Sequence, residues 1–366
     1  MYRKHIFLTF SLVAVLMLGG CDYLENFGSG EDDEGADTEF SFEDEGFGDG
    51  TEAGGPLVFL APRSIASMPW FLAAQEGVFD QYNGEFGAGI EFREASRRDS
   101  LEQFADGEAD AVIMTNIDAV ATVVGQAIEA DVIMVCGYSQ GNSAILISPD
   151  STSNLIGKTV AVEEFSADHY LLDRFLLKNL IDFDQVNIRN SEALAAAEAL
   201  SNPQVDAVIT SNPELTALVN SQSARVLFDS REIPKEIAYF LVVRRSRASD
   251  RPATQVLYAT WNNVMERLLG NQRAATLDSL AGLNNMERAE FERQFNSIVF
   301  TDTESKVLST LRDRKLQKTM RHVRFFIENH QLATGGEIVA NWYSLPGRTP
   351  ATLHFNAAPM EYFIAP

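Results

Sequence analysis

Short apolar runs alternate with amphipathic stretches from residue 57 onward, and this alternation limits the fold more than any other feature of the chain. Strands are predicted at 57–60, 90–94, 111–114, 132–135 and 144–147, with helices at 70–76, 99–105 and 117–130. Strands that alternate with helices at this spacing predict a parallel sheet with helices packed on its faces.

The same order begins again in the second half of the chain. Strands are predicted at 157–162, 186–189, 205–209, 226–228 and 239–243, with helices at 167–179, 192–200 and 213–221. Later residues are mainly helical, at 252–269, 271–281, 286–294, 302–312 and 314–330, and the tail 331–366 is irregular. We therefore expect an α/β protein with two lobes and a hinged cleft, with residues 56–148 and 245–366 in lobe 1 and 149–244 in lobe 2. Ligands of such sheets bind where the carboxyl ends of strands meet.

The N-terminus is typical of an exported lipoprotein. A short basic start precedes an apolar run over residues 6–20, which is too short to span a bilayer. Leu18-Gly19-Gly20-Cys21 resembles the bacterial lipobox, whose cysteine receives a lipid; the alternative is an ordinary signal with a chance cysteine. We expect a signal peptide over 1–20, a lipid anchor at Cys21 and a location on the periplasmic side of the inner membrane, or on the cell surface of a Gram-positive organism.

Residues 21–55 are predicted to form a disordered acidic tether. Residues 22–55 hold 13 Asp and Glu and no Lys, Arg or His, so they cannot bury enough apolar surface to become ordered. The whole chain carries a formal charge of −23, and the sequence displays no basic stripe. Nucleic acid is therefore not an expected partner. The second cysteine, Cys136, lies in an apolar run and is expected to be a buried thiol.

Two segments resemble the solute-binding proteins of ABC importers, in the nitrate/sulfonate/taurine-type branch. They are residues 69–79, PWFLAAQEGVF, and residues 104–112, FADGEADAV. Further segments resemble the binding proteins associated with urea/guanidine carboxylases: residues 114–119, 141–142, 166–172, 212–213, 228–230 and 233–234. The resemblance implies a periplasmic-binding-protein type II fold, a small nitrogen-rich solute, and permease and ATPase partners. This chain departs from the subgroup at Ser143, Asp168 and Ser211.

Polar side chains that follow predicted strands are the first candidates for solute binding. Asn116 and Asp118 follow the strand at 111–114, and Glu164 and Ser166 follow the strand at 157–162. A carboxylate can accept hydrogen bonds from an amidine or an amine. The alternative for Asp118 and Ser166 is a helix cap or a first-turn position, where the same side chains stabilise a helix N-terminus.

Six further candidates come from loops, helix starts and strand ends. Trp70 could lie over a planar cation, and the alternative is an aromatic side chain of the core. His169 could contact the solute, and the alternative is a packed histidine. Tyr138 and Asn142 lie on a glycine-rich crossing, which is a candidate hinge or ligand loop. Asn212 and Asp229 are weaker candidates, and each follows a strand of the second lobe.

No enzyme is predicted, and no cofactor or metal. Ser166, Asp168 and His169 are too close on one helix for a nucleophile–base relay, whose groups converge from separate elements. The five histidines show no metal-ligand spacing, and phosphate-loop and dinucleotide glycine patterns are absent. The alternative to a transport protein is a sensor or scaffold lipoprotein with the same fold.

Overall fold

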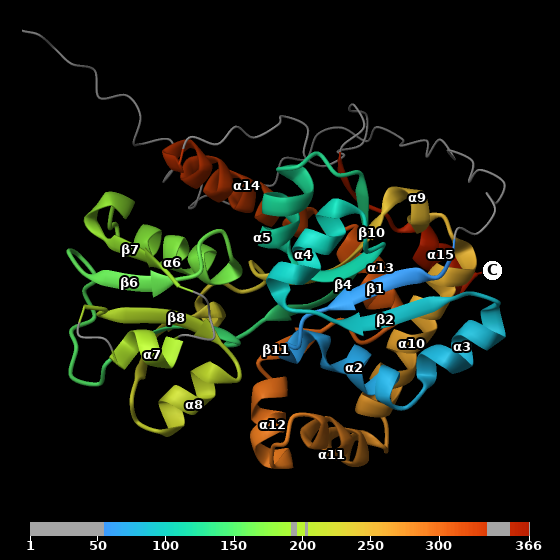
Figure 1. The fold of residues 1–366 in the computed structure, drawn as a ribbon. Coiled ribbons are helices and arrows are strands. Elements are labelled where there is room, and N and C mark those ends of the chain that lie inside the picture. The colour runs from blue at the N-terminus through green and yellow to red at the C-terminus, as the bar shows by residue number, and fades with distance from the viewer. Residues whose placement is uncertain (1–54, 192–195, 202–203, 335–351, 366) are drawn as a thin grey trace, which may run out of the picture. The chain divides into compact units, whose positions relative to one another are not determined.

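The computed structural model describes residues 55–191, 196–201, 204–334 and 352–365. The predicted signal peptide, Cys21 and the acidic tether up to residue 54 lie outside these residues. The described residues contain two sheets with helices packed around them (Figure 1). The predicted α/β class is therefore confirmed.

The first sheet has seven strands among the described residues, in the order β11-β4-β10-β3-β1-β2, and β12 also pairs with β4. Its longest strand, β4, is buried at every position, as expected for a strand covered on both faces. Gly137 allows β11 to approach β4, because a Cβ atom there would lie 2.8 Å from the Val299 carbonyl oxygen. The strands are β1 (Leu57–Ala61), β2 (Ile90–Glu94), β3 (Ala111–Thr115), β4 (Ala130–Ser139), β10 (Ala238–Arg244), β11 (Ile298–Phe300) and β12 (Leu353–Phe355).

The second sheet has five strands among the described residues, in the order β7-β6-β8-β5-β9. Strand β5 is antiparallel to β8 and β9, whereas β6 is parallel to its neighbours. The strands are β5 (Ser143–Ile147), β6 (Thr159–Val162), β7 (Asn187–Asn190), β8 (Ala207–Ser211) and β9 (Arg225–Asp229). Its helices are α6 (Ala167–Lys178), α7 (Ala196–Ser201) and α8 (Glu214–Asn220).

The remaining helices belong with the first sheet or extend from it. Helix α10 packs against α2 and α3, and α14 lies beside both α5 and α6 (Figure 1). The bounds are α2 (Met68–Gln75), α3 (Val78–Phe86), α4 (Arg97–Asp106), α5 (Asn116–Asp118), α9 (Arg245–Ala248), α10 (Arg251–Leu269), α11 (Arg273–Leu283), α12 (Arg288–Phe295), α13 (Glu304–Leu311), α14 (Arg314–Thr334) and α15 (Ala358–Ile364).

Strand pairing corrects two expectations. Strand β5 pairs within the second sheet and β10 within the first, the reverse of the predicted lobe assignment at 143–148 and 238–244. Each sheet is also mixed, not purely parallel. In the first sheet β10 enters antiparallel between β3 and β4, and in the second β5 is antiparallel to β8 and β9. The crossings between the sheets therefore lie at 140–142 and 230–237. The tail predicted to be irregular contains β12 and α15.

Candidate functional site

A cavity of about 1110 Å³ lies between the two sheets. The residues that follow β1, β2 and β3 line it from the first sheet, and those that follow β6 and β8 line it from the second. Carboxyl ends of parallel strands are the usual ligand edge of such sheets. The linings include Arg63, Arg97, Asp118, Asp168 and Asn212.

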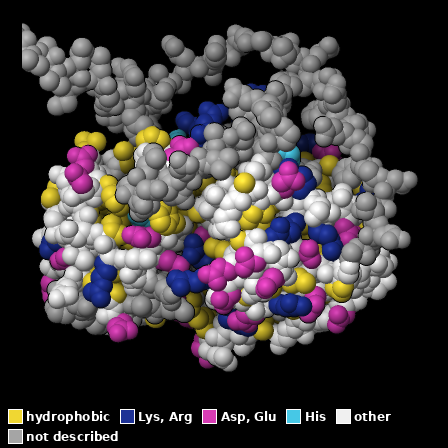
Figure 2. All heavy atoms as spheres, turned by 45° about the horizontal axis from the view of Figure 1, so that its top comes forward, with side chains coloured by type: hydrophobic (Ala, Val, Ile, Leu, Met, Phe, Trp, Pro, Cys, Tyr) yellow, Lys and Arg dark blue, Asp and Glu magenta, His cyan; other side chains and the backbone are white. Residues whose placement is uncertain are grey.

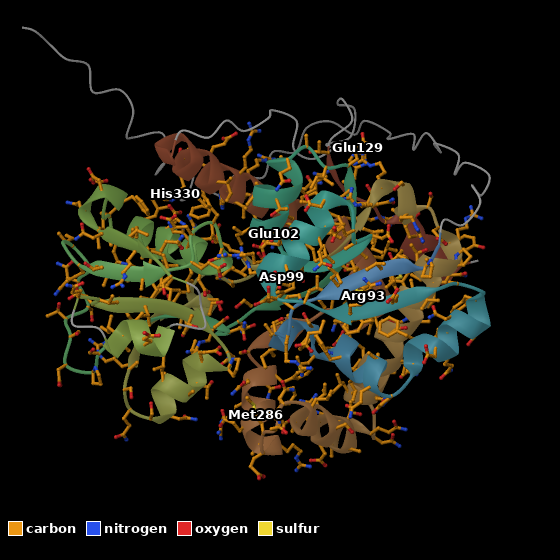
Figure 3. The ribbon with its side chains drawn as sticks, viewed as in Figure 1. Arg93, Asp99, Glu102, Glu129, Met286 and His330 are labelled. Atoms are coloured by element: carbon orange, nitrogen blue, oxygen red, sulfur yellow. The ribbon has the colours of Figure 1, made fainter. Side chains whose placement is uncertain are left out.

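Arg97 connects the two sides of this cavity. Helix α4 begins at Arg97, after the capping residue Ser96, whose side chain accepts a hydrogen bond from the Asp99 amide. In Figure 3, Asp99 and Glu102 mark α4 between the two sheets, and Met286 marks the cavity lining beside α12. The guanidinium of Arg97 donates from Nε to Asp118 Oδ1 at 3.0 Å and from Nη1 to Glu163 Oε1 at 2.6 Å.

Asp118 is fully engaged by these contacts. Its carboxylate is 1% exposed and closes a capping box in which Thr115 donates its amide at 3.1 Å and its hydroxyl at 2.8 Å to Oδ2. Burial opposes the positive charge of Arg97, but the neighbouring Asp118 and Glu163 outweigh burial and raise the pKa of the guanidinium. The two acids therefore hold a protein cation inside the cavity.

Asp168 is a buried carboxylate in the first turn of α6. Burial raises its pKa to about 6; a hydrogen bond from Ser143 and the charge of Arg97 act in the opposite direction, and Glu163 adds to the rise. Among the described side chains, no Lys or Arg lies within ion-pair distance of it. Above pH 6 it is a buried anion with no described Lys or Arg in direct contact, which is an unfavourable state for an ionised side chain.

Asn142 and Asn212 meet where the chain crosses between the sheets. The Asn142 amide donates to the Tyr239 hydroxyl at 3.0 Å and accepts from the Ser297 hydroxyl at 3.2 Å. Asn212 donates its side-chain amide to Ser297 at 3.2 Å and its backbone amide to the Asn142 carbonyl at 3.0 Å. Both asparagines line the cavity, and both join the second sheet to the first.

Four of the nine predicted binding residues line the cavity: Asp118, Asn142, Ser166 and Asn212. Ser166 is also the cap of α6, as its alternative reading predicted, because its hydroxyl accepts from the amides of Asp168 and His169. The structure places the other five outside the cavity lining.

Trp70 and Asn116 have structural contacts instead. The Trp70 side chain is fully buried, and its ring centroid lies 5.1 Å from those of Phe59 and Trp261. Asn116 donates to the Glu236 carbonyl at 2.9 Å and accepts from the Ala238 amide at 2.9 Å, so it holds the second crossing against α5. A helix start can face the core or the cleft, and sequence alone does not distinguish the two.

Tyr138, Glu164 and His169 also lie away from the cavity lining. Tyr138 is buried on β4, and burial raises its pKa to about 12. The neighbour of Glu164, Glu163, takes the position expected for Glu164. His169 accepts from the Phe165 amide at 3.1 Å, and burial, with a smaller contribution from His330, lowers its pKa to about 3. His330, on α14, lies beside α6 with its ring centroid 4.5 Å from that of His169 (Figure 3).

The cavity residues that the sequence analysis missed are mostly charged. Arg63 donates to Glu94 twice, from Nε at 3.0 Å and from Nη2 at 2.7 Å. Arg97 and Glu163 form the contact across the cavity. Glu94 ends a predicted strand and the other three follow one, and this position at a strand end is the signal that could have identified them.

Carboxylates outnumber arginines in the cavity. It is lined by three arginines, Arg63, Arg97 and Arg98, and by five acids, Glu94, Asp118, Glu163, Asp168 and Glu214. Figure 2 shows basic and acidic side chains interspersed on one face of the molecule. Arg63 and Arg97 are ion-paired, and the lining as a whole holds two more carboxylates than arginines (five minus three).

The described residues contain no group of three or more His, Cys, Asp and Glu side chains placed to hold a metal ion. Within the same residues, no helix is both long and apolar enough to cross a membrane. Cys136 is fully buried, as expected, and burial raises the pKa of its thiol.

The two sheets and the cavity between them define a periplasmic-binding-protein fold, which solved structures share. The alkanesulfonate-binding protein SsuA of Xanthomonas axonopodis pv. citri, bound to MOPS, is 21% identical over 74% of this chain and 96% of its own, with a TM-score of 0.57. The aliphatic sulphonate-binding protein SsuA of Escherichia coli is 19% identical over 76% of this chain and 94% of its own, with a TM-score of 0.61. A putative sulfonate-binding protein of Methylobacillus flagellatus KT is 14% identical over 78% of this chain and 89% of its own, also with a TM-score of 0.61. No protein-family model and no curated protein matches the sequence.

Proposed function

We propose that this chain is the solute-binding subunit of an ABC importer and that its cavity binds a small, cationic, nitrogen-rich solute. The observation that carries this proposal is the five-to-three excess of carboxylates over arginines in the cavity lining. The fold supports the general role, since the similar structures include sulfonate-binding proteins of ABC importers.

Asp168 is the carboxylate proposed to receive the cation. It is 7% exposed and has a raised pKa, so its ionised form is destabilised in the empty site. A guanidinium, amidinium or ammonium group would donate charge-assisted hydrogen bonds to it and offset that destabilisation. Ser143 and Asn142, on the same side of the cavity, supply further polar groups to a nitrogen-rich solute.

A sulfonate is less compatible with this lining. An anion needs a cation or donor that no protein carboxylate already engages. Two of the three arginines of the lining are engaged in this way: Arg97 contacts both Asp118 and Glu163, and Arg63 makes a bidentate contact with Glu94. The proposed solutes are therefore guanidine-like or amine-like, with urea as a neutral relative.

The proposed partners are a membrane permease and its ATPase subunit. The proposed location is the periplasmic side of the inner membrane, with the chain anchored by a lipid on Cys21 and separated from the bilayer by the acidic tether. Mass spectrometry of the protein purified from membranes would test the anchor: a diacylated Cys21 at the N-terminus is the expected form, and an unmodified internal Cys21 would contradict it.

Calorimetric titration of the purified protein tests the proposed solute class. Guanidinium, acetamidine, methylamine, urea, taurine and nitrate are the titrants, and a cation is expected to bind most tightly. Asp168→Asn is expected to weaken that binding by on the order of 100-fold, because one partner of a buried charge pair is removed. Asp206→Asn is the matched control, since Asp206 pairs with Lys158 at a largely exposed site. Tight binding of taurine or nitrate, unaffected by Asp168→Asn, would contradict the proposal.

One observation favours the alternative of a sensor or scaffold with the same fold. The Arg97 guanidinium already occupies the space between Asp118 and Glu163, so the protein itself supplies a cation to two of the five carboxylates. A titration in which none of the solutes binds to protein shown to be folded would favour this alternative.

A further inference from the structure

Helix α14 presents a line of basic side chains to solvent. Its opposite face is buried in the core through Leu316, Met320, Val323, Phe326 and Ile327. Arg314, Lys318, Arg321 and Phe325 follow one another at intervals of four, three and four residues, which places them along one side of the helix. At 1.5 Å per residue the line is about 16 Å long. Lys315 is exposed beside it.

The four basic residues of this line, here called the α14 stripe, are Arg314, Lys315, Lys318 and Arg321. No carboxylate among the described side chains lies within ion-pair distance of them. The flanking arginines are different, since Arg312 contacts Glu361 and Arg324 pairs with Glu328 at 2.7 Å. The linear sequence displays no basic stripe, because the spacing becomes a continuous line only when the segment is helical.

The charge of the stripe opposes that of the rest of the chain. Residues 56–366 contain 39 Asp and Glu against 27 Lys and Arg. Four cations on one helix face without a described carboxylate partner are therefore a local reversal of sign. Phe325 continues the line, and its side chain is 52% exposed. A surface that combines cations with an exposed aromatic ring matches a lipid headgroup layer, where aromatic side chains lie at the boundary between polar and apolar regions.

We propose that the α14 stripe, together with Phe325, binds the surface of a bilayer that contains anionic phospholipid. An anionic surface complements the positive charge of the stripe. The exposed ring of Phe325 favours a bilayer over an acidic protein. The apolar run at residues 6–20 and the lipobox-like Cys21 also favour a bilayer. This inference is independent of the solute that the cavity binds. In the bound state α14 faces the bilayer, and the body of the protein adopts one orientation on the membrane.

Vesicle co-sedimentation tests this inference with the full chain. All samples carry Cys21→Ser, so that no lipid is attached and the N-terminal segment contributes equally throughout. The probes are vesicles of phosphatidylcholine alone and vesicles with phosphatidylglycerol added. The stripe variant carries Arg314→Gln, Lys315→Gln, Lys318→Gln and Arg321→Gln. Its affinity for the anionic vesicles is expected to fall by on the order of 100-fold, and high salt is expected to remove the preference of the unsubstituted stripe.

A matched variant controls for total charge. Arg93→Gln, Arg288→Gln, Arg293→Gln and Lys306→Gln remove the same number of cations from exposed ion pairs elsewhere. Circular dichroism melting shows that each variant is folded. The control variant is expected to bind anionic vesicles as the unsubstituted protein does. The proposal would be overturned if the protein bound both kinds of vesicle equally, or if the stripe and control variants lost equal affinity. It would also be overturned, in favour of an acidic protein partner, if the protein bound soluble poly-glutamate but not anionic vesicles.

Discussion

Arg97 Nη1 lies 2.6 Å from Glu163 Oε1, so the start of α4 on the first sheet is joined directly to the residue that follows β6 on the second. The same guanidinium contacts the buried Asp118. One side chain thereby links the two sheets across the cavity and compensates two carboxylates.

Arg97→Ala is expected to lower the free energy of unfolding by about 2 kcal/mol. Breaking a buried ion pair on one side costs about 3–5 kcal/mol, and the effect is smaller here because the Arg97 side chain is 31% exposed. Urea denaturation is the measurement, and Arg63→Ala, whose pair with Glu94 is exposed, is expected to cost less than about 1 kcal/mol. Millimolar guanidinium is expected to stabilise the Arg97→Ala variant more than the unsubstituted protein; equal losses in the two variants would contradict the buried link.

Asp168→Asn is expected to stabilise the empty protein at neutral and alkaline pH. The pKa of Asp168 is about 6 in the folded state, against a reference value of 3.8 for the unfolded chain. Between these two pH values the folded state therefore binds more protons than the unfolded state does. The stability contributed by this group therefore falls as pH rises from about 4 to 6, by up to about 3 kcal/mol for the shift of two pKa units. Denaturation of both proteins at pH 4 and pH 8 measures the difference. An advantage of Asn that is the same at both pH values would contradict the shifted pKa.

Solute affinity is expected to follow the ionisation of the same carboxylate. Protonation of Asp168 removes the proposed acceptor, so binding of a cationic solute is expected to weaken as pH falls below about 6. Titrations at pH 5 and pH 7.5 measure this change, and Asp168→Asn is expected to abolish most of the pH dependence. A pH profile that is unchanged in the variant would assign the dependence to another group.

Trp70→Ala is expected to cost stability, with no direct effect on solute contacts. A fully buried tryptophan that packs on Phe59 and Trp261 leaves a large cavity when it is truncated, and such changes cost about 3–5 kcal/mol. Trp70→Phe keeps part of the packing and is the milder comparison. Denaturation measures the loss, and titration of the folded variants is expected to give an unchanged solute affinity.

Asn142→Ala is expected to cost about 1–3 kcal/mol. The substitution removes a buried amide that bonds to both Tyr239 and Ser297, and it leaves their hydroxyl groups without this partner. Amide hydrogen exchange at the crossing between the sheets is expected to accelerate, because the same amide joins the two sheets. Unchanged exchange at 138–143 would show that the backbone bond between Asn212 and Asn142 suffices.

Most strands were predictable because their signal is local. An apolar run such as Ala111–Thr115 or Ala207–Ser211 is recognisable without knowledge of its neighbours, and both are strands in the structure. The sheet to which a strand belongs is not local. Ser143–Ile147 and Ala238–Arg244 were assigned to the wrong lobes because their partners are separated from them by long stretches of chain.

The cavity residues show the same difference between local signals, which are predictable, and long-range contacts, which are not. Asp118, Ser166, Asn142 and Asn212 were predictable because each follows a strand or lies on a crossing, and the ends of strands meet at the ligand edge. Trp70 and Asn116 lie outside the cavity lining, because the direction in which a side chain points depends on what packs against it. Arg97 follows a predicted strand too, but its role arises from two acids that are distant in sequence.

Local residue patterns establish the alternation of strands and helices, the α/β class and the positions of several side chains at strand ends, since these depend on neighbouring residues. Long-range packing establishes which strands share a sheet, which carboxylates lie together and which cation compensates them. The α14 stripe depends on both local pattern and tertiary packing. Helical spacing aligns its residues, and burial of the opposite face turns them toward solvent. Contacts between residues far apart in the chain exist only after folding, and the pairing of Arg97 with Glu163 is such a contact.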